Sequence, residues 1–481
     1  MTRNIALFIL DTVRKDYFDD YAWRTKRKSG TSFSQCRAAS SWSVPSHASI
    51  FSGELPHQHN IHSESFDGSF DFHSKLRNQT FLDDLESYDT FGVSSNIYIN
   101  EDFGFGKLFN QFRDHSIGDH YSAVPFPEAS IDLTSNHGNL LEKYLKGTKK
   151  ALSSRYPLKN LLNGMWLSFG DKLENIPLPR VGDKGAKANA DSILQFISDT
   201  SEPYFVFANF MDAHNPLQNS VVYDQSLHSV QNSWSSNEYD KWELLIEGCD
   251  DDDYIQNYRE LYGTSIDYLD QVIHDLSNDI LSQSDNETTI IVTADHGHNL
   301  GYDMENGYFH HTASLSEGVL HVPLEIINPP PEWPAEVTNK FSQVHIPQLV
   351  ELIKNGEWDE KVLENESVVA ERIGLLGENS EIDYPNSNEI DEEFWNRMIR
   401  CGYDKSIKYE WDSLDNSKKY ELDIEQACWQ SLCSKEPVIP DRILALFDEE
   451  INEYKSKWGN QKQDLSFDPD TAQDLKDLGY L

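Results

Sequence analysis

The sequence is poor in cysteine and contains no long apolar segment, and these two absences exclude several classes of protein. Its five cysteines show no CxxC spacing and are too sparse for a disulfide scaffold, so we expect reduced thiols. No run of about 18 apolar residues occurs, so we expect no membrane span. The chain leads directly into NIALFILD rather than into the apolar core of a signal peptide. We therefore expect a cytoplasmic protein.

Basic side chains are also scarce: 40 Lys and Arg stand against 81 Asp and Glu, a net charge of −41. This charge repels the phosphates of nucleic acid, so we expect no nucleic-acid partner. It suits the high-salt cytosol of a halophile, where dissolved ions screen the repulsion between like charges. The stretch Lys143–Arg155 is either a local basic patch or a solvated helix face, and we favour the helix face.

The pattern of apolar residues predicts an α/β fold. Three runs, Ile5–Leu10, Tyr204–Phe210 and Thr289–Thr293, are continuous rather than alternating, which is typical of parallel strands buried on both faces. Helical patterns at Lys187–Ile197 and Tyr258–Leu276 lie between the later runs. Strands that alternate with helices indicate a large, mostly parallel sheet flanked by helices.

At 481 residues the chain exceeds the usual size of one domain. We predict a catalytic domain over residues 1–356 and, where the composition turns to short mixed segments, a smaller C-terminal α+β domain over residues 357–481. The acidic segment Glu238–Asp253 is expected to be an irregular surface insertion. Together with Asp119–Ser135 it is expected to help set specificity. The sequence gives no prediction of the oligomeric state.

Polar side chains follow each of the three predicted strands. The first strand is followed by Asp11, the second by Asp212 and His214, and the third by Asp295 and His296. A single Asp after a strand is usually a turn or cap residue. Open α/β sheets, however, bind ligands at the carboxyl ends of their strands, and three such ends carry carboxylates or imidazoles here. We therefore predict a ligand site at this edge of the sheet.

A candidate nucleophile lies in the segment SWSVPSHASIFSG, Ser41–Gly53. Pro45 favours the first turn of a helix and Gly53 its end, which puts Ser43 at or just before the helix N-terminus. Free backbone N–H groups and the positive end of the helix dipole favour an anion there. A hydroxyl at this position either attacks a bound anionic ester or simply caps the helix, and this segment alone leaves both interpretations open.

The segments around these residues resemble the sulfatase family of the alkaline-phosphatase superfamily. The family signature has Cys or Ser, any residue, Pro, any residue and Arg ahead of a helix that ends in Thr-Gly. The similar segments occur in the family's order along nearly the whole chain: NIALFILDTVRKDYF, SVPSHASIFSG, GVSSNIYINEDFGFGKLF, FVFANFMDAHNPL, TTIIVTADHGHNLGY, HTASLSEGVLHVPLEI and the terminal DLKDLGYL. The resemblance implies an alkaline-phosphatase-like sandwich and the hydrolysis of an ester.

The resemblance also implies one divalent metal ion, held by Asp11, Asp295 and His296 with the Ser43 side chain on the same ion. Mostly oxygen donors with one imidazole suit Ca²⁺, our first expectation, or Mg²⁺ or Mn²⁺. Many sulfatases have two consecutive Asp residues in the first turn, whereas this chain has Asp11 followed by Thr12. Either the site is one carboxylate poorer, or Thr12 or water supplies the missing oxygen.

The remaining site residues carry over from the same motifs. His47, one helical turn after Ser43, would steady the nucleophile or the leaving anion. His214 and His311 would act as hydrogen-bond donors to the ester or as the acid for the leaving alcohol, and Asn96 would contact the substrate. Most sulfatases oxidise their Cys or Ser to formylglycine, but His47 replaces the signature arginine. Formylglycine at Ser43 and an unmodified serine nucleophile therefore both stay open.

Three functions follow from the motifs. The first is hydrolysis of a sulfate ester, of a small organic alcohol or a glycan, by one ion and Ser43. The second is a phosphodiesterase or phosphotransferase with a second metal on Asp212, His214 and His311, in which two ions about 4 Å apart favour phosphoryl transfer. The third is a relative that keeps the fold and has lost catalysis. Metal content per chain distinguishes the first two.

Overall fold

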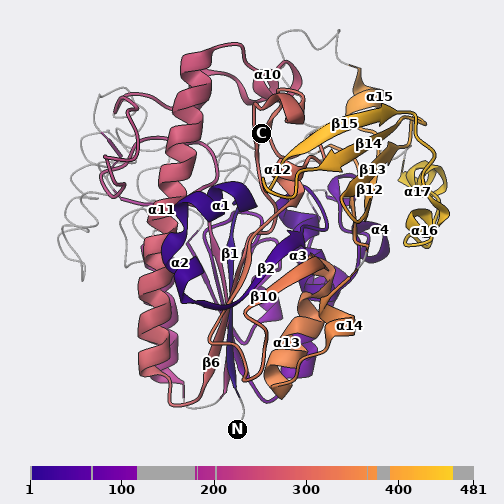
Figure 1. Cartoon of the computed structure of the whole chain (residues 1–481). Coiled ribbons are helices and arrows are strands. Elements are labelled where there is room, and N and C mark those ends of the chain that lie inside the picture. Colours follow the sequence, from indigo (N-terminus) through magenta and orange to yellow (C-terminus); the bar gives the residue numbers. More distant parts are fainter. Residues whose placement is uncertain are drawn as a thin grey trace, which may run out of the picture.

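The computed structural model describes residues 3–66, 69–115, 179–180, 182–200, 203–365, 367–375 and 391–458 (Figure 1). The stretch Lys143–Arg155, the loop Asp119–Ser135 and the terminal DLKDLGYL lie outside these residues, so the predictions on them stay predictions.

A mostly parallel sheet forms the centre of the molecule. In the described residues it has eight strands in the order β10-β2-β9-β6-β1-β5-β3-β4. Strand β1 pairs in parallel with both β5 and β6, whereas β9 runs antiparallel to β6 and β2. The strands are β1 (Asn4–Leu10), β2 (Ser29–Arg37), β3 (Asp89–Ser94), β4 (Gln111–Asp114), β5 (Tyr204–Phe210), β6 (Thr288–Thr293), β9 (Leu324–Ile327) and β10 (Glu336–Ser342).

The three predicted apolar runs are the three central strands β6, β1 and β5, and every residue in them is buried. Helices cover both faces, as Figure 1 shows: α1, α2, α9 and α11 on one side, α3 and α13 on the other. The predicted helices fall within α9 and α11. These helices are α1 (Lys15–Tyr21), α2 (Trp23–Lys28), α3 (Ser43–Ser52), α9 (Ala186–Asp199), α11 (Asp252–Gln283) and α13 (Ile346–Asn355).

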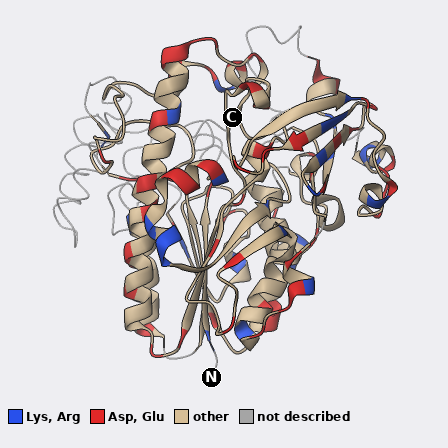
Figure 2. Ribbon diagram, viewed as in Figure 1, with Lys and Arg blue, Asp and Glu red and all other residues tan. Residues whose placement is uncertain are grey.

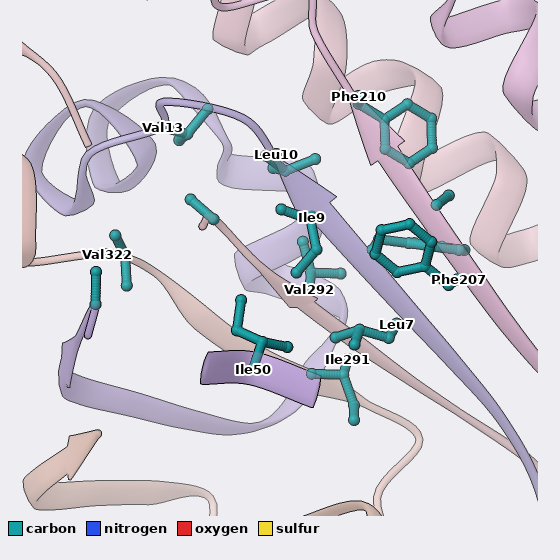
Figure 3. Close-up of a cluster of buried hydrophobic side chains, with 14 of the residues drawn as sticks. Leu7, Ile9, Leu10, Val13, Ile50, Phe207, Phe210, Ile291, Val292 and Val322 are labelled. Atoms are coloured by element: carbon teal, nitrogen blue, oxygen red, sulfur yellow. The ribbon is translucent and has the colours of Figure 1, made fainter. Parts of the chain in front are cut away.

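The core on the α3 face brings that helix onto the sheet. Figure 3 shows Ile50 of α3 beside Leu7 of β1 and Ile291 of β6, with Phe207 of β5 next to them. All four side chains are fully buried. Burial of this kind stabilises the fold by about 1.5–3 kcal/mol per large side chain. It also holds the last turn of α3 against β1 and β6.

A second, antiparallel sheet follows, in the order β11-β12-β13-β14-β15, with short helices beside it. The large sheet with this smaller α+β unit confirms the predicted fold class, and the domain boundary after residue 356 stays a prediction. The unit comprises β11 (Val369–Arg372), β12 (Ile399–Asp404), β13 (Ile407–Asp412), β14 (Ser417–Leu422), β15 (Gln430–Lys435), α15 (Glu392–Trp395), α16 (Asp441–Leu444) and α17 (Ile451–Trp458).

Short elements complete the described chain. They are α4 (Pro56–His59), α5 (Phe72–Leu76), α10 (Lys241–Ile246), α12 (Glu317–Leu320), α14 (Glu360–Leu363), β7 (Asn299–Leu300), β8 (Phe309–His310), and the 3-10 helices Ser63–Ser65, Phe81–Leu85, Gly106–Leu108, Ser236–Glu238, Asp303–Glu305 and Gln343–His345. Helix α10 corrects one prediction. The segment Glu238–Asp253 is not wholly irregular, because Leu244 and Leu245 of α10 are buried.

Several cations of this acidic chain lie inside it. Arg14, Arg37, Arg372 and Arg400 are each at most 2% exposed. Arg14 pairs with Glu305 at 2.6 Å, Arg37 with Glu317 at 2.9 Å and Arg400 with Glu371 at 3.0 Å. Figure 2 shows Asp and Glu along the outer helices. In the described residues no helix is both long enough and apolar enough to cross a membrane.

Candidate active site

The carboxyl ends of β1 and β6 bring two carboxylates and an imidazole together. One ligand atom each of Asp11, Asp295 and His296 lies within 4.8 Å of the other two, and all three side chains are buried. Within the described ranges this is the only group of three or more His, Cys, Asp or Glu residues that meets this criterion. The adjacency of β1 and β6 produces it, because both residues that follow Leu10 and Ala294 emerge at the same edge.

The chemistry of this group fits a divalent cation. Asp11 Oδ1, Asp295 Oδ2 and His296 Nε2 are fully buried and have no hydrogen-bond partner among the described residues. Burial raises the pKa of Asp11 to about 7, helped by the negative charge of Asp295, and burial raises the pKa of Asp295 to about 7 as well. Buried, unpaired carboxylates are costly unless a cation compensates them. Two carboxylates and one imidazole form a suitable ligand set.

Ser43 lies beside this group at the first residue of α3. The N-cap is Trp42, and no side chain caps the helix. The Ser43 hydroxyl instead donates to Asp11 Oδ2 at 3.2 Å and accepts from Asn96 Nδ2 at 3.1 Å. The interpretation of Ser43 as a helix cap is therefore wrong. Its hydroxyl faces the carboxylates at the positive end of the helix dipole, where an anion is favoured.

Asn209 on the neighbouring strand β5 and Asn96 just after β3 hold Asp11. Asn96 Nδ2 donates to Asp11 Oδ2 at 2.7 Å, and Asn209 Nδ2 does so at 3.4 Å. Asn209 was not predicted from the sequence. The available signal was its position as the single amide in the otherwise apolar strand YFVFANF. These amides leave Asp11 Oδ1 as the unpaired oxygen.

The comparisons with known proteins agree with this geometry. The family model described as sulfatase matches residues 3–351, more than half of the chain. The chain belongs to the sulfatase family. It is therefore an ester hydrolase, as the motifs predicted. Among curated proteins none matches it.

Solved structures similar to this sulfatase have low sequence identity. Phosphonate monoester hydrolase of Agrobacterium radiobacter has 14% identity and a TM-score of 0.55, over 87% of this chain and 89% of that one. A protein solved with its substrate D-glucosamine-2-N,6-O-disulfate has 13% identity and a TM-score of 0.51, over 88% and 91%. A 2-O GAG sulfatase has 13% identity and a TM-score of 0.51, over 98% of this chain and 96% of that one. At these identities the likeness shows the fold alone.

His47 occupies the position of the signature arginine and lies beside the ligand group of this sulfatase, with Nδ1 3.7 Å from Asp295 Oδ2 and Nε2 3.3 Å from Asn209 Nδ2. Its Nδ1 bonds the Ser43 carbonyl oxygen at 2.8 Å, and its ring meets Phe105 and Phe207 edge-on. Burial lowers the pKa of His47 to about 3, so the ring is uncharged at neutral pH. The described contacts therefore connect His47 both to the main chain of the nucleophile and to the ligand Asp295. Without a charge, His47 does not replace arginine as a cation.

Thr12 lies next to the ligand group. Its hydroxyl donates to the Asp11 carbonyl at 2.6 Å, and its backbone N–H donates to Asp295 Oδ1 at 3.3 Å. The main chain of Thr12 takes a left-handed conformation, with φ of 63°. Thr12 is therefore part of the turn that holds Asp295, and its hydroxyl as the source of the missing oxygen stays a prediction.

Two predicted histidines approach from the other strand ends. The His311 ring lies 4.4 Å from that of His296 and 5.5 Å from that of His214, centroid to centroid. Burial lowers the pKa of both His214 and His311, and neighbouring histidines lower it further. Both rings are therefore neutral at pH 7. Neutral imidazole carries one N–H donor and one acceptor.

The proposed second metal site does not assemble in the described residues. Asp212, His214 and His311 do not form a group of ligand atoms within 4.8 Å of one another. Asp212 Oδ1 accepts instead from the backbone N–H of Lys184 at 2.9 Å. Lys184 was not predicted either, and its ammonium donates to the His214 carbonyl. Burial lowers the pKa of Lys184 to about 7, although Asp212 and Asp11 act in the opposite direction.

Proposed function

We propose that this sulfatase hydrolyses sulfate monoesters of a sugar or another organic alcohol, with Ser43 or its formylglycine form as the nucleophile. One observation carries the proposal. The Ser43 hydroxyl lies 3.2 Å from Asp11 Oδ2, beside three buried ligand atoms that have no hydrogen-bond partner in the described chain. A nucleophile, an anion-favouring helix N-terminus and a cation site coincide there.

The ion would be held by Asp11, Asp295 and His296, with Ca²⁺ as the first candidate and Mg²⁺ or Mn²⁺ as alternatives. When bound, it would polarise the ester oxygens and favour the ionised form of the nucleophile. The amide of Asn96 orients the nucleophile, because its Nδ2–H occupies one lone pair of the Ser43 oxygen. A second lone pair stays available for attack on sulfur.

The reaction begins with one displacement at sulfur. The nucleophilic oxygen at Ser43 forms a bond to sulfur as the bond between sulfur and the ester oxygen breaks; the nucleophile loses a proton, the leaving oxygen gains one, and the alcohol departs. A second step, which with the first consumes one water overall, releases sulfate and regenerates the site. His311 supplies a hydrogen bond to the ester through the one N–H of its neutral ring. The N–H of neutral His214 is on Nδ1 and donates to the Asn215 carbonyl at 2.6 Å, which leaves Nε2 of His214 as an acceptor. Donors that are already oriented stabilise the charge that develops as the ester bond breaks.

The chemical form of Ser43 decides between two routes of release. Formylglycine hydrate expels sulfate through its second hydroxyl, whereas an unmodified serine sulfate ester needs attack by water. Intact-mass and peptide-mapping mass spectrometry around Ser43 distinguishes them, because oxidation of serine to formylglycine removes two hydrogens. A full-mass serine would favour the phosphatase-like route and the phosphoryl-transfer alternative.

Activity assays test the function itself. Wild type and Ser43→Ala are compared on 4-nitrophenyl sulfate, a sugar sulfate and bis(4-nitrophenyl) phosphate with each candidate ion. We expect wild type to prefer sulfate esters and Ser43→Ala to lose activity by more than about 10³-fold, as enzymes do without their nucleophile. Full activity in Ser43→Ala refutes covalent attack. A wild type that is inactive with every ion would favour the catalytically inactive relative.

A further inference from the structure

Three side chains from distant parts of the chain form a hydrogen-bonded line that ends beside the metal group. The Tyr258 hydroxyl of α11 lies 2.8 Å from His298 Nε2, and His298 Nδ1 lies 3.3 Å from His311 Nδ1. Tyr258 is fully buried and His298 is 1% exposed. Neither Tyr258 nor His298 was among the predicted site residues. The line leaves Nε2 as the free ring nitrogen of His311.

The hydroxyl proton of Tyr258 gives this line a direction. In the described part of the chain His298 Nε2 is the only hydrogen-bond partner of the Tyr258 oxygen. A buried hydroxyl that does not donate its hydrogen loses about 1–3 kcal/mol, so Tyr258 donates. A neutral His298 that accepts at Nε2 carries its hydrogen on Nδ1. That hydrogen is donated to His311 Nδ1, and the hydrogen of His311 is then on Nε2.

The middle ring of the line is held firmly. The backbone N–H of His298 donates to the Gly318 carbonyl at 2.9 Å, and its carbonyl accepts from Arg14 Nη1 at 3.0 Å. The His298 ring also stacks on Tyr258 and Tyr262, with centroids 6.0 Å apart in each pair. The main-chain bonds fix the place of the residue, and the bond from Tyr258 to Nε2 favours the ring orientation that points Nδ1 at His311. The tautomer of His311 is therefore set from outside the site.

We propose that Tyr258 and His298 are positioning residues that keep His311 as an Nε2–H donor to the leaving oxygen of the ester. The inference rests on the proposed function, and it names the substrate class more closely. Negative charge on the leaving oxygen is greatest when the alcohol is a weak acid, so a fixed donor matters most for alkyl and sugar sulfates. Aryl sulfates release a stabilised phenolate and need it less.

A leaving-group comparison tests the proposal. Tyr258→Phe is measured on an alkyl sulfate and on 4-nitrophenyl sulfate, and Tyr254→Phe is the matched control. Tyr254 lies one turn earlier on α11, is 2% exposed, and donates to the Ser236 carbonyl at 2.8 Å, outside the line. We expect kcat/KM of Tyr258→Phe to fall about tenfold on the alkyl ester, as for a lost hydrogen bond, and less than about threefold on the aryl ester. The proposal would be overturned if kcat/KM of Tyr258→Phe fell equally on both esters or did not fall. It would also be overturned if Tyr254→Phe showed the same difference between the two esters.

A second pair of variants separates positioning from packing. His298→Asn keeps an amide N–H near the place of Nδ1, whereas His298→Ala removes the donor. We expect His298→Asn to keep the wild-type ratio of kcat/KM on the alkyl ester to kcat/KM on the aryl ester. We expect His298→Ala to lower that ratio. If both variants behave alike, the contact between His298 and His311 does not position the donor.

Histidine NMR measures the tautomer of His311 independently of catalytic activity. Protein with ¹⁵N-labelled histidine is compared with its His311→Asn variant to assign the His311 resonances. We expect wild-type His311 to be protonated at Nε2, and His298→Ala to populate the other tautomer. Protonation at Nδ1 in wild type contradicts the proposal. A wild type that shows the expected tautomer and hydrolyses no sulfate ester would refute the proposed function alone.

Discussion

Removal of the ion should lower the free energy of unfolding. The way this free energy depends on the ion concentration should show whether one ion or two are bound. Without a cation, Asp11 Oδ1, Asp295 Oδ2 and His296 Nε2 are buried and have no hydrogen-bond partner within the described residues. Because Asp295 Oδ2 and His296 Nε2 lie 3.4 Å apart and partly compensate each other, we count them as one group. At about 1–3 kcal/mol for each unsatisfied group, roughly 2–6 kcal/mol is available to favour binding. This estimate predicts that at least one of Ca²⁺, Mg²⁺ and Mn²⁺ stabilises the folded chain strongly.

Mass action gives the size of the effect. One ion that binds only the folded state raises the free energy of unfolding by about 2.7 kcal/mol at 100 times its Kd and by about 4.1 kcal/mol at 1,000 times. The gain is therefore about 1.4 kcal/mol for each tenfold rise in free ion. Two ions bound together would double that slope. Urea unfolding of chelator-treated protein, titrated with each ion, measures it.

Two buried carboxylates at the ends of β6 and β5, the two strands that flank β1, supply the variants. In Asp295→Asn the free energy of unfolding should no longer depend on the ion concentration, because the substitution removes a charged ligand. Asp212→Asn is the matched control, since Asp212 is equally buried and lies outside the ligand group. We expect it to keep the single-ion slope. A wild type that no ion stabilises, or an Asp295→Asn protein with an unchanged slope, would refute the assignment, and a doubled slope that Asp212→Asn halves would favour two metals.

Three further perturbations have defined outcomes. Asn96→Ala should weaken ion binding by about 10–100-fold in calorimetry, because Asp11 loses its 2.7 Å donor. Gly297→Ala should abolish binding, since a Cβ there would stand 2.1 Å from the Gly318 carbonyl oxygen and displace the chain next to His296. His57→Gln should destabilise the fold most below about pH 6.5. Burial lowers the pKa of His57, but its bonds to Glu371 and Asp448 outweigh burial and raise the pKa above its ordinary value.

The sign for His57 follows from linkage. A histidine whose folded-state pKa is raised stabilises the fold fully below its unfolded pKa, near 6.5, and the effect disappears as the pH rises through the folded-state pKa. The difference in urea stability between wild type and His57→Gln should therefore shrink towards alkaline pH, and a growing difference would contradict it. Asn100→Ala serves as the control for Asn96→Ala, because the Asn100 side chain accepts from the Phe103 N–H at 3.0 Å. Gly307→Ala is the control for backbone strain alone, because φ of Gly307 is 72° but its would-be Cβ has no atom within 4 Å; it should lower stability and keep ion binding.

The strands and their polar ends were readable from the sequence because both are local patterns. Continuous apolar runs predicted β1, β5 and β6 to within one residue at each end. The rule that ligands bind at carboxyl ends then joined Asp11 to Asp295, although 284 positions separate them. In the structure β1 and β6 are adjacent and parallel, so Asp11 and Asp295 lie at the same edge of the sheet.

The contacts that were missed depend on tertiary packing. Tyr258 reaches His298 because α11 lies across the loop after β6, and no spacing in the sequence encodes that crossing. The direction of the His47 ring is set by Phe105 and Phe207, which come from two separate segments. Chain patterns therefore located the site, and only the packed structure showed which atoms of each residue face it.

The buried arginines have a consequence for how the substrate arrives. Arg14, Arg37 and Arg400 are paired with carboxylates inside the chain, so they are not at the surface to attract an anion. A sulfate ester that diffuses towards a chain of net charge −41 is repelled at long range. Dissolved salt shortens the reach of that repulsion to about 8 Å at physiological strength and about 3 Å at 1 M. The association rate of an anionic substrate should therefore rise with ionic strength.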